Sequence, residues 1–126
     1  MNDKFRVVLE DRLLPAQVFF NAIPDSSFIS TLKSFEQGVG AGFNDAYCGF
    51  PGEEEYGEEP LNGIEFAIKG EEVILDYNEF YSILENACSA YIDMHPDQIN
   101  AVTGILLKIK KKLNSLKQKR GRSPLE

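Results

Sequence analysis

Residues 64–96 read IEFAIKGEEVILDYNEFYSILENACSAYIDMHP, and they contain the clearest structural pattern in this 126-residue chain. Two apolar runs, IEFAIK and EEVILDY, flank Gly70, a residue type that adopts positive φ without strain and so suits a tight turn. The alternate positions of the first run are apolar: Ile64, Phe66 and Ile68. Because successive side chains of a strand point to opposite faces, one face is apolar. The pattern predicts an antiparallel hairpin near residues 63–76.

A helix is predicted directly after this hairpin. Asp76 and Glu79 form a capping box, in which each side chain bonds a free backbone N–H group at the helix start. Apolar residues then recur at intervals of three and four, namely Tyr77, Phe80, Tyr81, Leu84, Ala87, Cys88 and Tyr91. This spacing places one apolar stripe along a helix of about five turns. The helix is expected to end at His95, and Pro96 suits the first turn of another helix.

The C-terminal part of the chain has a second helical pattern. Its apolar residues follow the three–four spacing of an a/d seam: Ile99, Val102, Leu106, Ile109, Leu113 and Leu116. The short link between the two patterns predicts that the helices pack as a hairpin. After about Ser115 the sequence is polar and contains Gly and Pro, which favours fraying. We therefore expect one domain over residues 1–118 and a frayed tail over 119–126.

The N-terminal part has weaker patterns. Residues 4–23 mix strand-like and helix-like signals, and we expect strand in part of both FRVVLE and LLPAQVFFNAI. A helix is expected from Asp25 or Ser26 to Gly38, with one apolar face made of Phe28, Ile29, Leu32 and Phe35. Residues 38–62 are rich in Gly and Pro and predict a long loop, which is usually functional or mobile. Together these patterns predict an α+β fold, in which a small antiparallel sheet packs against helices and a helical hairpin lies at the C-terminus.

Charge is unevenly distributed along the chain. Positions 1–107 hold nineteen acidic and five basic residues, a net charge of −14, whereas positions 108–126 hold eight basic residues and one acid, a net charge of +7. Such an acidic body repels nucleic acid and membrane surfaces and attracts basic proteins. The N-terminal residues, MNDKFRVVLEDR, lack the apolar centre of a signal peptide, and no apolar run is long enough to span a bilayer. A cytoplasmic protein with a basic protein partner is therefore expected.

Few residues are suited to chemistry. Cys48 and Cys88 are expected to be free thiols that act as small apolar side chains, rather than redox or metal groups. His95 is the single histidine, and its place before Pro96 favours a capping or surface role over that of a base. The glycines of GVGAGF follow a helix and lack the Lys-Ser/Thr of a phosphate loop. Neither a catalytic site, a metal site nor a cofactor is expected.

Two stretches together resemble a known family: AYCGFPGEEEYGEEPLNGIEFAI (46–68) and YNEFYSILENACSAYIDMHPDQINAVTGILLKI (77–109). They are similar to the ribonuclease-toxin immunity proteins of bacterial contact-dependent growth inhibition systems. The resemblance extends roughly from Val18 to Leu113. It implies a cytoplasmic inhibitor, without catalytic activity, that binds the nuclease domain of a cognate toxin. Because nucleases that bind RNA phosphates usually present a cationic cleft, an acidic inhibitor can cover that cleft.

The acidic run EEEYGEE, residues 53–59, is the first candidate for the contact with such a toxin. The candidate residues are Asp45, Glu53, Glu54, Glu55, Tyr56, Glu58 and Glu59, with Glu71 and Glu72 as second choices. They are chosen for charge and expected exposure, with Tyr56 as an aromatic anchor. Composition alone favours a solvated loop for this run, and its spacing does not match a calcium loop.

Two other functions are compatible with the same residues. An acidic regulator that mimics nucleic acid would bind several host nucleic-acid-binding proteins with weak discrimination. A small enzyme based on two carboxylates is less favoured, since nineteen acids in the body always provide carboxylate pairs. Direct binding of nucleic acid or of a membrane is not expected.

Overall fold

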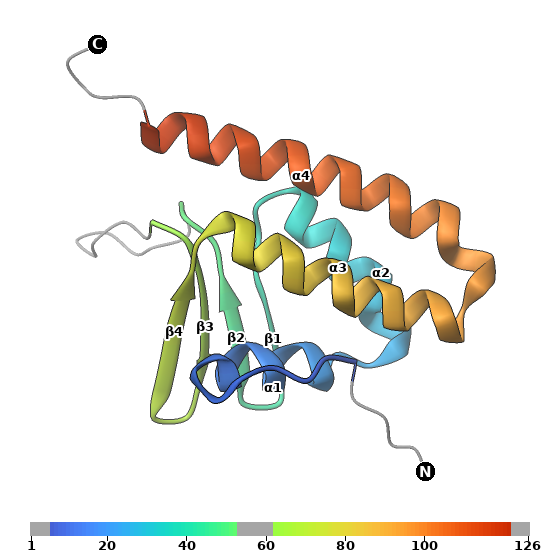
Figure 1. Ribbon diagram of the computed structural model, residues 1–126, viewed down its shortest axis with the longest axis horizontal. Helices are drawn as coiled ribbons and strands as arrows, with labels where there is room; N and C mark the ends of the chain where they lie inside the picture. The colour runs from blue at the N-terminus through green and yellow to red at the C-terminus, as the bar shows by residue number, and fades with distance from the viewer. Residues whose placement is uncertain (1–5, 53–61, 122–126) are drawn as a thin grey trace.

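The computed structural model describes residues 6–52 and 62–121 of the chain, with side chains as far as Lys117 (Figure 1). The elements in these ranges are η1 Asp11–Leu13, α1 Leu14–Ala22, α2 Asp25–Glu36, β1 Ala41–Phe43, β2 Ala46–Gly49, β3 Ile64–Ile68, β4 Glu71–Leu75, α3 Tyr77–Met94, η2 Pro96–Gln98 and α4 Ile99–Gly121. The predicted α+β fold is confirmed.

The four strands form one antiparallel sheet in the order β1-β2-β3-β4. The predicted hairpin is confirmed as β3 and β4, which pair Phe66 with Val73 and turn at Gly70 with a φ of 80°. On its other side β3 pairs with β2, where Cys48 lies opposite Phe66. The two tight turns, β1–β2 and β3–β4, lie at the same end of the sheet (Figure 1).

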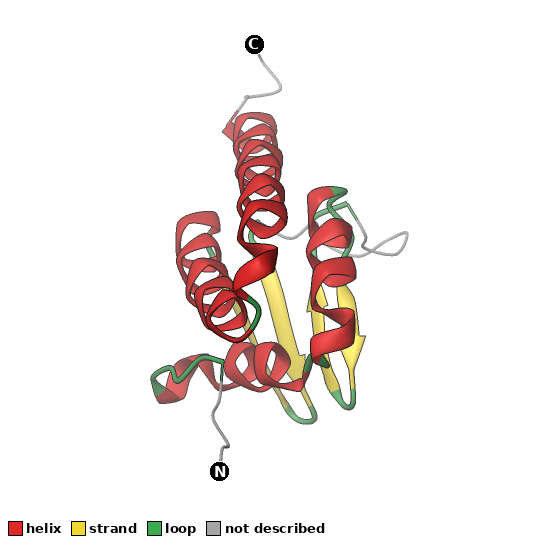
Figure 2. Cartoon of the chain, turned by 90° about the vertical axis from the view of Figure 1, so that its right-hand side faces the viewer, coloured by secondary structure: helices red, strands yellow, loops and turns green. Residues whose placement is uncertain are grey.

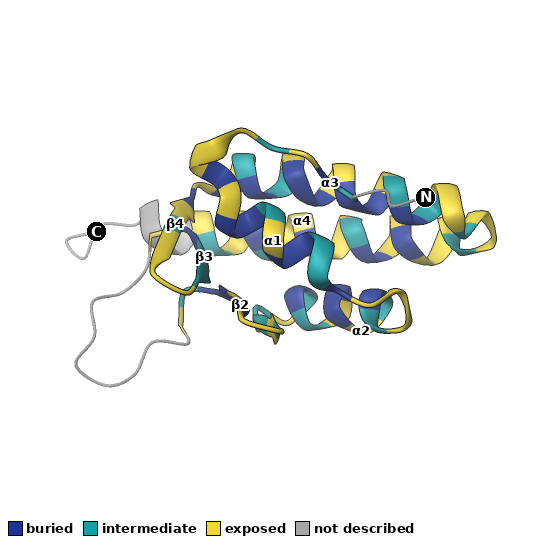
Figure 3. Cartoon of the chain, turned by 90° about the horizontal axis from the view of Figure 1, so that it is seen from below, coloured by how far each residue is buried: buried dark blue, intermediate teal, exposed yellow. Residues whose placement is uncertain are grey.

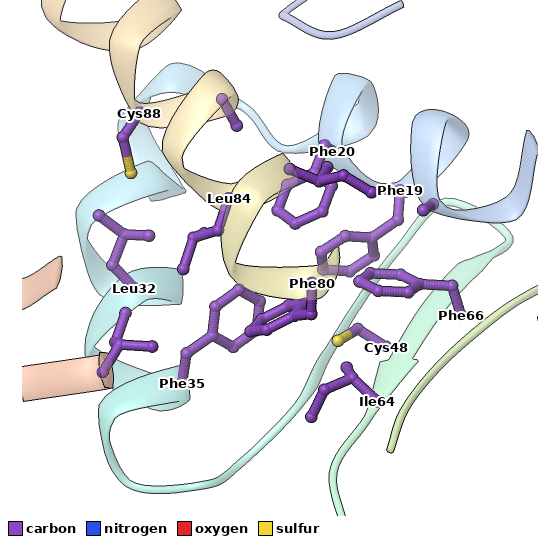
Figure 4. Close-up of a cluster of buried hydrophobic side chains, with 14 of the residues drawn as sticks. Phe19, Phe20, Leu32, Phe35, Cys48, Ile64, Phe66, Phe80, Leu84 and Cys88 are labelled. Atoms are coloured by element: carbon purple, nitrogen blue, oxygen red, sulfur yellow. The ribbon is translucent and has the colours of Figure 1, made fainter. Parts of the chain in front are cut away.

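Helix α1 covers one face of the sheet and places two phenylalanine rings on it. The rings of Phe19 and Phe20 each lie 5.5 Å, centroid to centroid, from the ring of Phe66. Phe80 of α3 lies 6.0 Å from Phe66 and 5.7 Å from Phe35 of α2. Figure 4 shows these side chains meeting between the sheet and the helices. All five rings are fully buried, so aromatic packing joins three helices to the sheet at the centre of the core.

Helix α3 begins and helix α2 ends with recognisable caps. The Asp76 carboxylate accepts a 2.7 Å hydrogen bond from the Glu79 backbone N–H, which confirms half of the capping box. The expected reciprocal bond is wrong, because the Glu79 carboxylate instead accepts from Arg12 at 2.5 Å. Helix α2 ends at Glu36 and is capped by Gly38, which has a φ of 76°; the backbone N–H groups of Gly38 and Val39 donate hydrogen bonds to the last turn of the helix. This is a Schellman cap, and it confirms the predicted end of the helix.

The predicted C-terminal helical hairpin is confirmed as α3 and α4, joined through the 3-10 turn η2 (Figure 2). Helix α4 packs against both α2 and α3, and the Tyr81 hydroxyl of α3 donates a 3.2 Å hydrogen bond to the Leu106 carbonyl of α4. The buried residues of α4 are Val102, Ile105, Ile109 and Leu113. The prediction is wrong for one position of the seam. Ile99 is 49% exposed, because it lies in the first turn of α4, directly after η2.

The strands expected within residues 4–23 are not formed in the described part of that segment; LPAQVFFNA is helix α1 instead. Pro15 lies in its first turn, and the burial of Ala16, Phe19 and Phe20 follows the three–four spacing of a helix. The backbone of residues 7–10 bonds α1 side chains rather than a strand. The Asn21 amide bonds both the N–H and the C=O of Val7, each at 3.0 Å. Side-chain amides thus replace a strand partner.

The long loop expected over residues 38–62 is only partly correct. Strands β1 and β2 form inside it, and Cys48 lies buried in β2 rather than in a loop. These strands have three and four residues, too few to give a clear alternation. Strand β2 is held by non-local pairing with β3, which local sequence does not reveal, and β1 pairs in turn with β2.

Helix α4 continues to Gly121, so the expected domain boundary at residue 118 falls within it and stays a prediction. Within residues 6–52 and 62–121, the structure contains no helix with the length and apolar character needed to cross a membrane.

Candidate functional site

The structure places three of the nine candidate contact residues. Asp45 lies in the turn between β1 and β2, and Glu71 and Glu72 are the first residues of β4. All three are exposed. The remaining candidates lie outside the described residues: Glu53, Glu54, Glu55, Tyr56, Glu58 and Glu59.

Glu72 and Asp45 lie close to the two turns, at the same end of the sheet. Tyr47 of β2 lies opposite Ala67 of β3, which lies opposite Glu72 of β4. Directly opposite residues of an antiparallel sheet share a face, so Glu72 shares the outward face with Tyr47. Beside them is an open depression of about 440 Å³ lined by Asp45, Tyr47, Ala67, Ile68 and Lys69. The two turns thus meet around one concave surface.

The exposed apolar residues on the outward face of the sheet are absent from the candidates chosen from sequence. Tyr47 is 46% exposed and Ile74 of β4 is 48% exposed, both on the face of the sheet away from α1. Ile74 could have been found, because in EEVIL the alternate residues Val73 and Leu75 point to the core. Tyr47 could not, since it lies in a strand that the sequence did not predict.

Several acids of the body are already engaged within the protein. Asp25 pairs with Arg6 at 2.6 Å and lies 3.4 Å from His95, and Glu79 pairs with Arg12. The hydrogen bond with Glu79 raises the pKa of Arg12. These pairs connect the N-terminal segment to α2 and α3. They therefore serve the fold rather than a partner.

The acids at the turn end of the sheet differ from this group. Within the described residues, Asp45, Glu71 and Glu72 take part in no ion pair. Their charges are available to a partner. Lys69 is the basic residue that lines the depression beside them.

The lysines of α4 contribute to packing on the opposite side of the molecule. The Lys117 ammonium donates to the Asn78 side-chain oxygen at 3.3 Å, and the Lys110 ammonium lies 5.8 Å from the centroid of the Tyr81 ring. Both contacts join α4 to α3. Part of the basic C-terminal charge is therefore used to attach α4, and it does not neutralise the acids of the sheet turns.

The cysteines and the histidine lie in structural positions. Cys48 and Cys88 are buried and form no disulfide, and burial raises the pKa of Cys88 to about 12. A thiol with that pKa stays neutral and is a poor nucleophile. His95 caps α3, and its ring lies 4.4 Å from the Tyr91 ring. The described residues include no group of three or more His, Cys, Asp or Glu that could hold a metal ion.

A family model described as CDI immunity protein matches residues 10–106. The chain belongs to the CDI immunity protein family. The matched range runs from the start of η1 into the middle of α4, so it includes the whole sheet and the acids at its turns. A comparison with curated proteins gives no match.

As a member of this family, the immunity protein binds a cognate toxin protein and neutralises it. Family membership confirms the resemblance to immunity proteins of contact-dependent growth inhibition, and the ribonuclease nature of the toxin stays a prediction. It assigns the function to protein recognition, so the exposed surface with available charge and apolar side chains is the relevant site. In the described part of the chain, the turn end of the sheet combines both features.

Proposed function

We propose that this immunity protein neutralises a secreted ribonuclease toxin domain by binding over its basic active-site region, in the cytoplasm and without catalysing a reaction. The observation that carries the proposal is the net charge of −14 over positions 1–107 in a member of an immunity protein family. A ribonuclease must attract RNA phosphates, so its substrate cleft is cationic. An acidic protein bound there excludes RNA, because it occupies the same cationic cleft.

The proposed contacts are the exposed acids at the turn end of the sheet, Asp45, Glu71 and Glu72, together with the acidic run at 53–59. Support for the three described acids comes from their exposure and from the absence of ion pairs to them within the described residues. Charges of this kind steer association and raise its rate. Binding should therefore weaken as salt rises, mainly through slower association.

The test uses the cognate toxin domain, sought in the reading frame directly upstream of this protein, co-expressed with it and purified. The expected result is a stable complex on size-exclusion chromatography, in which the toxin no longer cleaves RNA. A toxin that cleaves no RNA, or that does not co-elute with the immunity protein, would contradict the proposal.

A matched pair of charge reversals tests the location of the contact. The double variant Glu71→Lys/Glu72→Lys should slow association about tenfold or more at low salt. The control, Asp93→Lys/Asp97→Lys, changes the net charge equally at exposed positions at the end of α3 and in η2. If the contact is local to the sheet turns, the control slows association much less. Equal slowing by both variants would mean that only the overall field matters.

A further inference from the structure

The outward face of the sheet has an unusual composition for a surface in contact with water. By the strand register its residues are Gly42, Tyr47, Gly49, Glu65, Ala67, Glu72 and Ile74. In an antiparallel sheet with one solvated face, apolar residues that point inward normally alternate with polar residues that point outward. Here only two of the seven are charged, and the others are small, aliphatic or aromatic. In Figure 3, α1, α3 and α4 lie on the other side of the sheet.

The two large apolar side chains of this face lie over buried glycines. A β-carbon at Gly49 would be 2.8 Å from the Tyr47 Oη atom and 3.0 Å from its Cε2 atom. A β-carbon at Gly63 would be 3.0 Å from the Ile74 Cγ2 atom. The glycines therefore leave room for Tyr47 and Ile74 to lie against the sheet. The result is a low, firm apolar surface, whose side chains lose little freedom when a partner covers them.

The depression next to Tyr47 is suited to a basic side chain. It is bounded by the Asp45 carboxylate and the Tyr47 side chain, with Ala67 between the strands. A guanidinium or ammonium group inserted there can pair with Asp45 and stack on the Tyr47 ring. Lys69 also lines the depression and repels an incoming cation on its own side, so the inserted group is directed toward Asp45.

We propose that this outward face is the docking surface for the toxin domain, with Tyr47 as the central anchor, Ile74 as a second apolar contact and a basic toxin side chain in the depression beside Asp45. The inference rests on the proposed function. It adds an apolar centre to an interface for which only acidic contacts were proposed above. Interfaces combine apolar or aromatic centres with charged rims, and here Glu72 and Asp45 are at the rim. The acidic rim complements the basic surface expected of a ribonuclease.

The experiment measures the affinity of the purified upstream toxin domain for three variants of the full chain. Tyr47→Ala and Ile74→Lys should each weaken binding about 30-fold or more, the loss typical of a central interface residue. Leu107→Ala is the control, since Leu107 is an exposed apolar residue of α4. It should bind like the wild type. Tyr47→Phe keeps the ring and should retain most of the affinity, and thermal unfolding of each variant confirms that it is folded.

The outcomes separate the two proposals. If the wild type does not bind the toxin, the proposed function fails, and this inference fails with it. If the wild type binds and folded Tyr47→Ala and Ile74→Lys bind equally well, the docking surface is wrong while the function stands. Loss of self-association in the Tyr47→Ala variant, with toxin affinity unchanged, would instead assign the face to a second copy of this chain and overturn the inference.

Discussion

Replacing Phe80 with alanine tests the aromatic centre of the core most severely. Phe80 is fully buried. Its ring has four aromatic neighbours at centroid distances of 5.7–6.5 Å: Phe20, Phe35, Phe50 and Phe66. Deleting a buried phenylalanine ring costs about 3–5 kcal/mol, depending on how far the site collapses.

The neighbours of Phe80 come from α1, α2, β3 and the residue that follows β2, so they cannot move inward together without disturbing the sheet. We therefore expect Phe80→Ala to cost about 4–5 kcal/mol, in the upper part of that range. For a domain of this length that corresponds to a fall in Tm of about 15–20 °C.

Guanidinium unfolding followed by circular dichroism measures the change in the free energy of unfolding. Phe80→Leu, which keeps a branched apolar side chain, should recover about half of the loss or more. A loss below about 2 kcal/mol for Phe80→Ala would refute the reasoning, because it would mean that the four rings repack readily around the gap.

Four further predictions concern stability. Gly104→Ala should raise the free energy of unfolding by about 0.5–1 kcal/mol, because Gly104 lies in α4 and a β-carbon there meets no atom within 4 Å. Gly63→Ala should lower it by about 1–3 kcal/mol, since its β-carbon would lie 2.3 Å from a carbonyl oxygen of β4. Asn21→Ala should cost about 1–3 kcal/mol by leaving the Val7 backbone groups without their partner. The raised pKa of Cys88 predicts loss of stability with rising pH between its ordinary value of 9.0 and about 12, because the unfolded chain ionises first.

Chemical unfolding of each variant tests these predictions and can contradict each of them. If Gly104→Ala and Gly63→Ala change the free energy of unfolding in the same direction, the difference in free space around the two glycines does not decide the effect. An Asn21→Ala variant as stable as the wild type would show that water replaces the side-chain amide. For Cys88, a Cys88→Ala variant should lose the alkaline dependence of about 1.4 kcal/mol per pH unit, and an unchanged dependence would assign it to other groups.

The sequence predicts the C-terminal half of the fold well. The hairpin of β3 and β4 has two apolar runs about Gly70, of which the first alternates, and α3 and α4 have long stripes at three–four spacing. These are local patterns of sufficient length to be read without tertiary information. Strands β1 and β2 are shorter, and β2 depends on pairing with β3 while β1 pairs in turn with β2, so their sequence does not identify them.

The error at α1 has a different physical cause. Val18, Phe19 and Phe20 have high strand propensity, yet they lie in a helix because Phe19 and Phe20 both point into the core against Phe66. Tertiary packing outweighs local preference there. Residues 7–10 resemble a strand in sequence, but their backbone bonds Asn21 and Gln17 of α1 instead of a sheet.

The candidate site could be predicted from the sequence in part. Charge identified Asp45, Glu71 and Glu72, which the structure places as exposed residues at one end of the sheet. Their role as contacts stays a prediction. Charge could not identify Tyr47, because its exposure depends on which face of an unpredicted strand it occupies.

The most direct test of the central claim is a titration of RNA cleavage. A fixed concentration of the purified upstream toxin domain, well above the dissociation constant, is mixed with increasing amounts of this immunity protein, and the rate of RNA cleavage is measured. The account predicts a linear fall that reaches zero at one equivalent, as expected for a tight inhibitor that covers the active site. Cleavage that persists when the immunity protein is in excess would contradict the account.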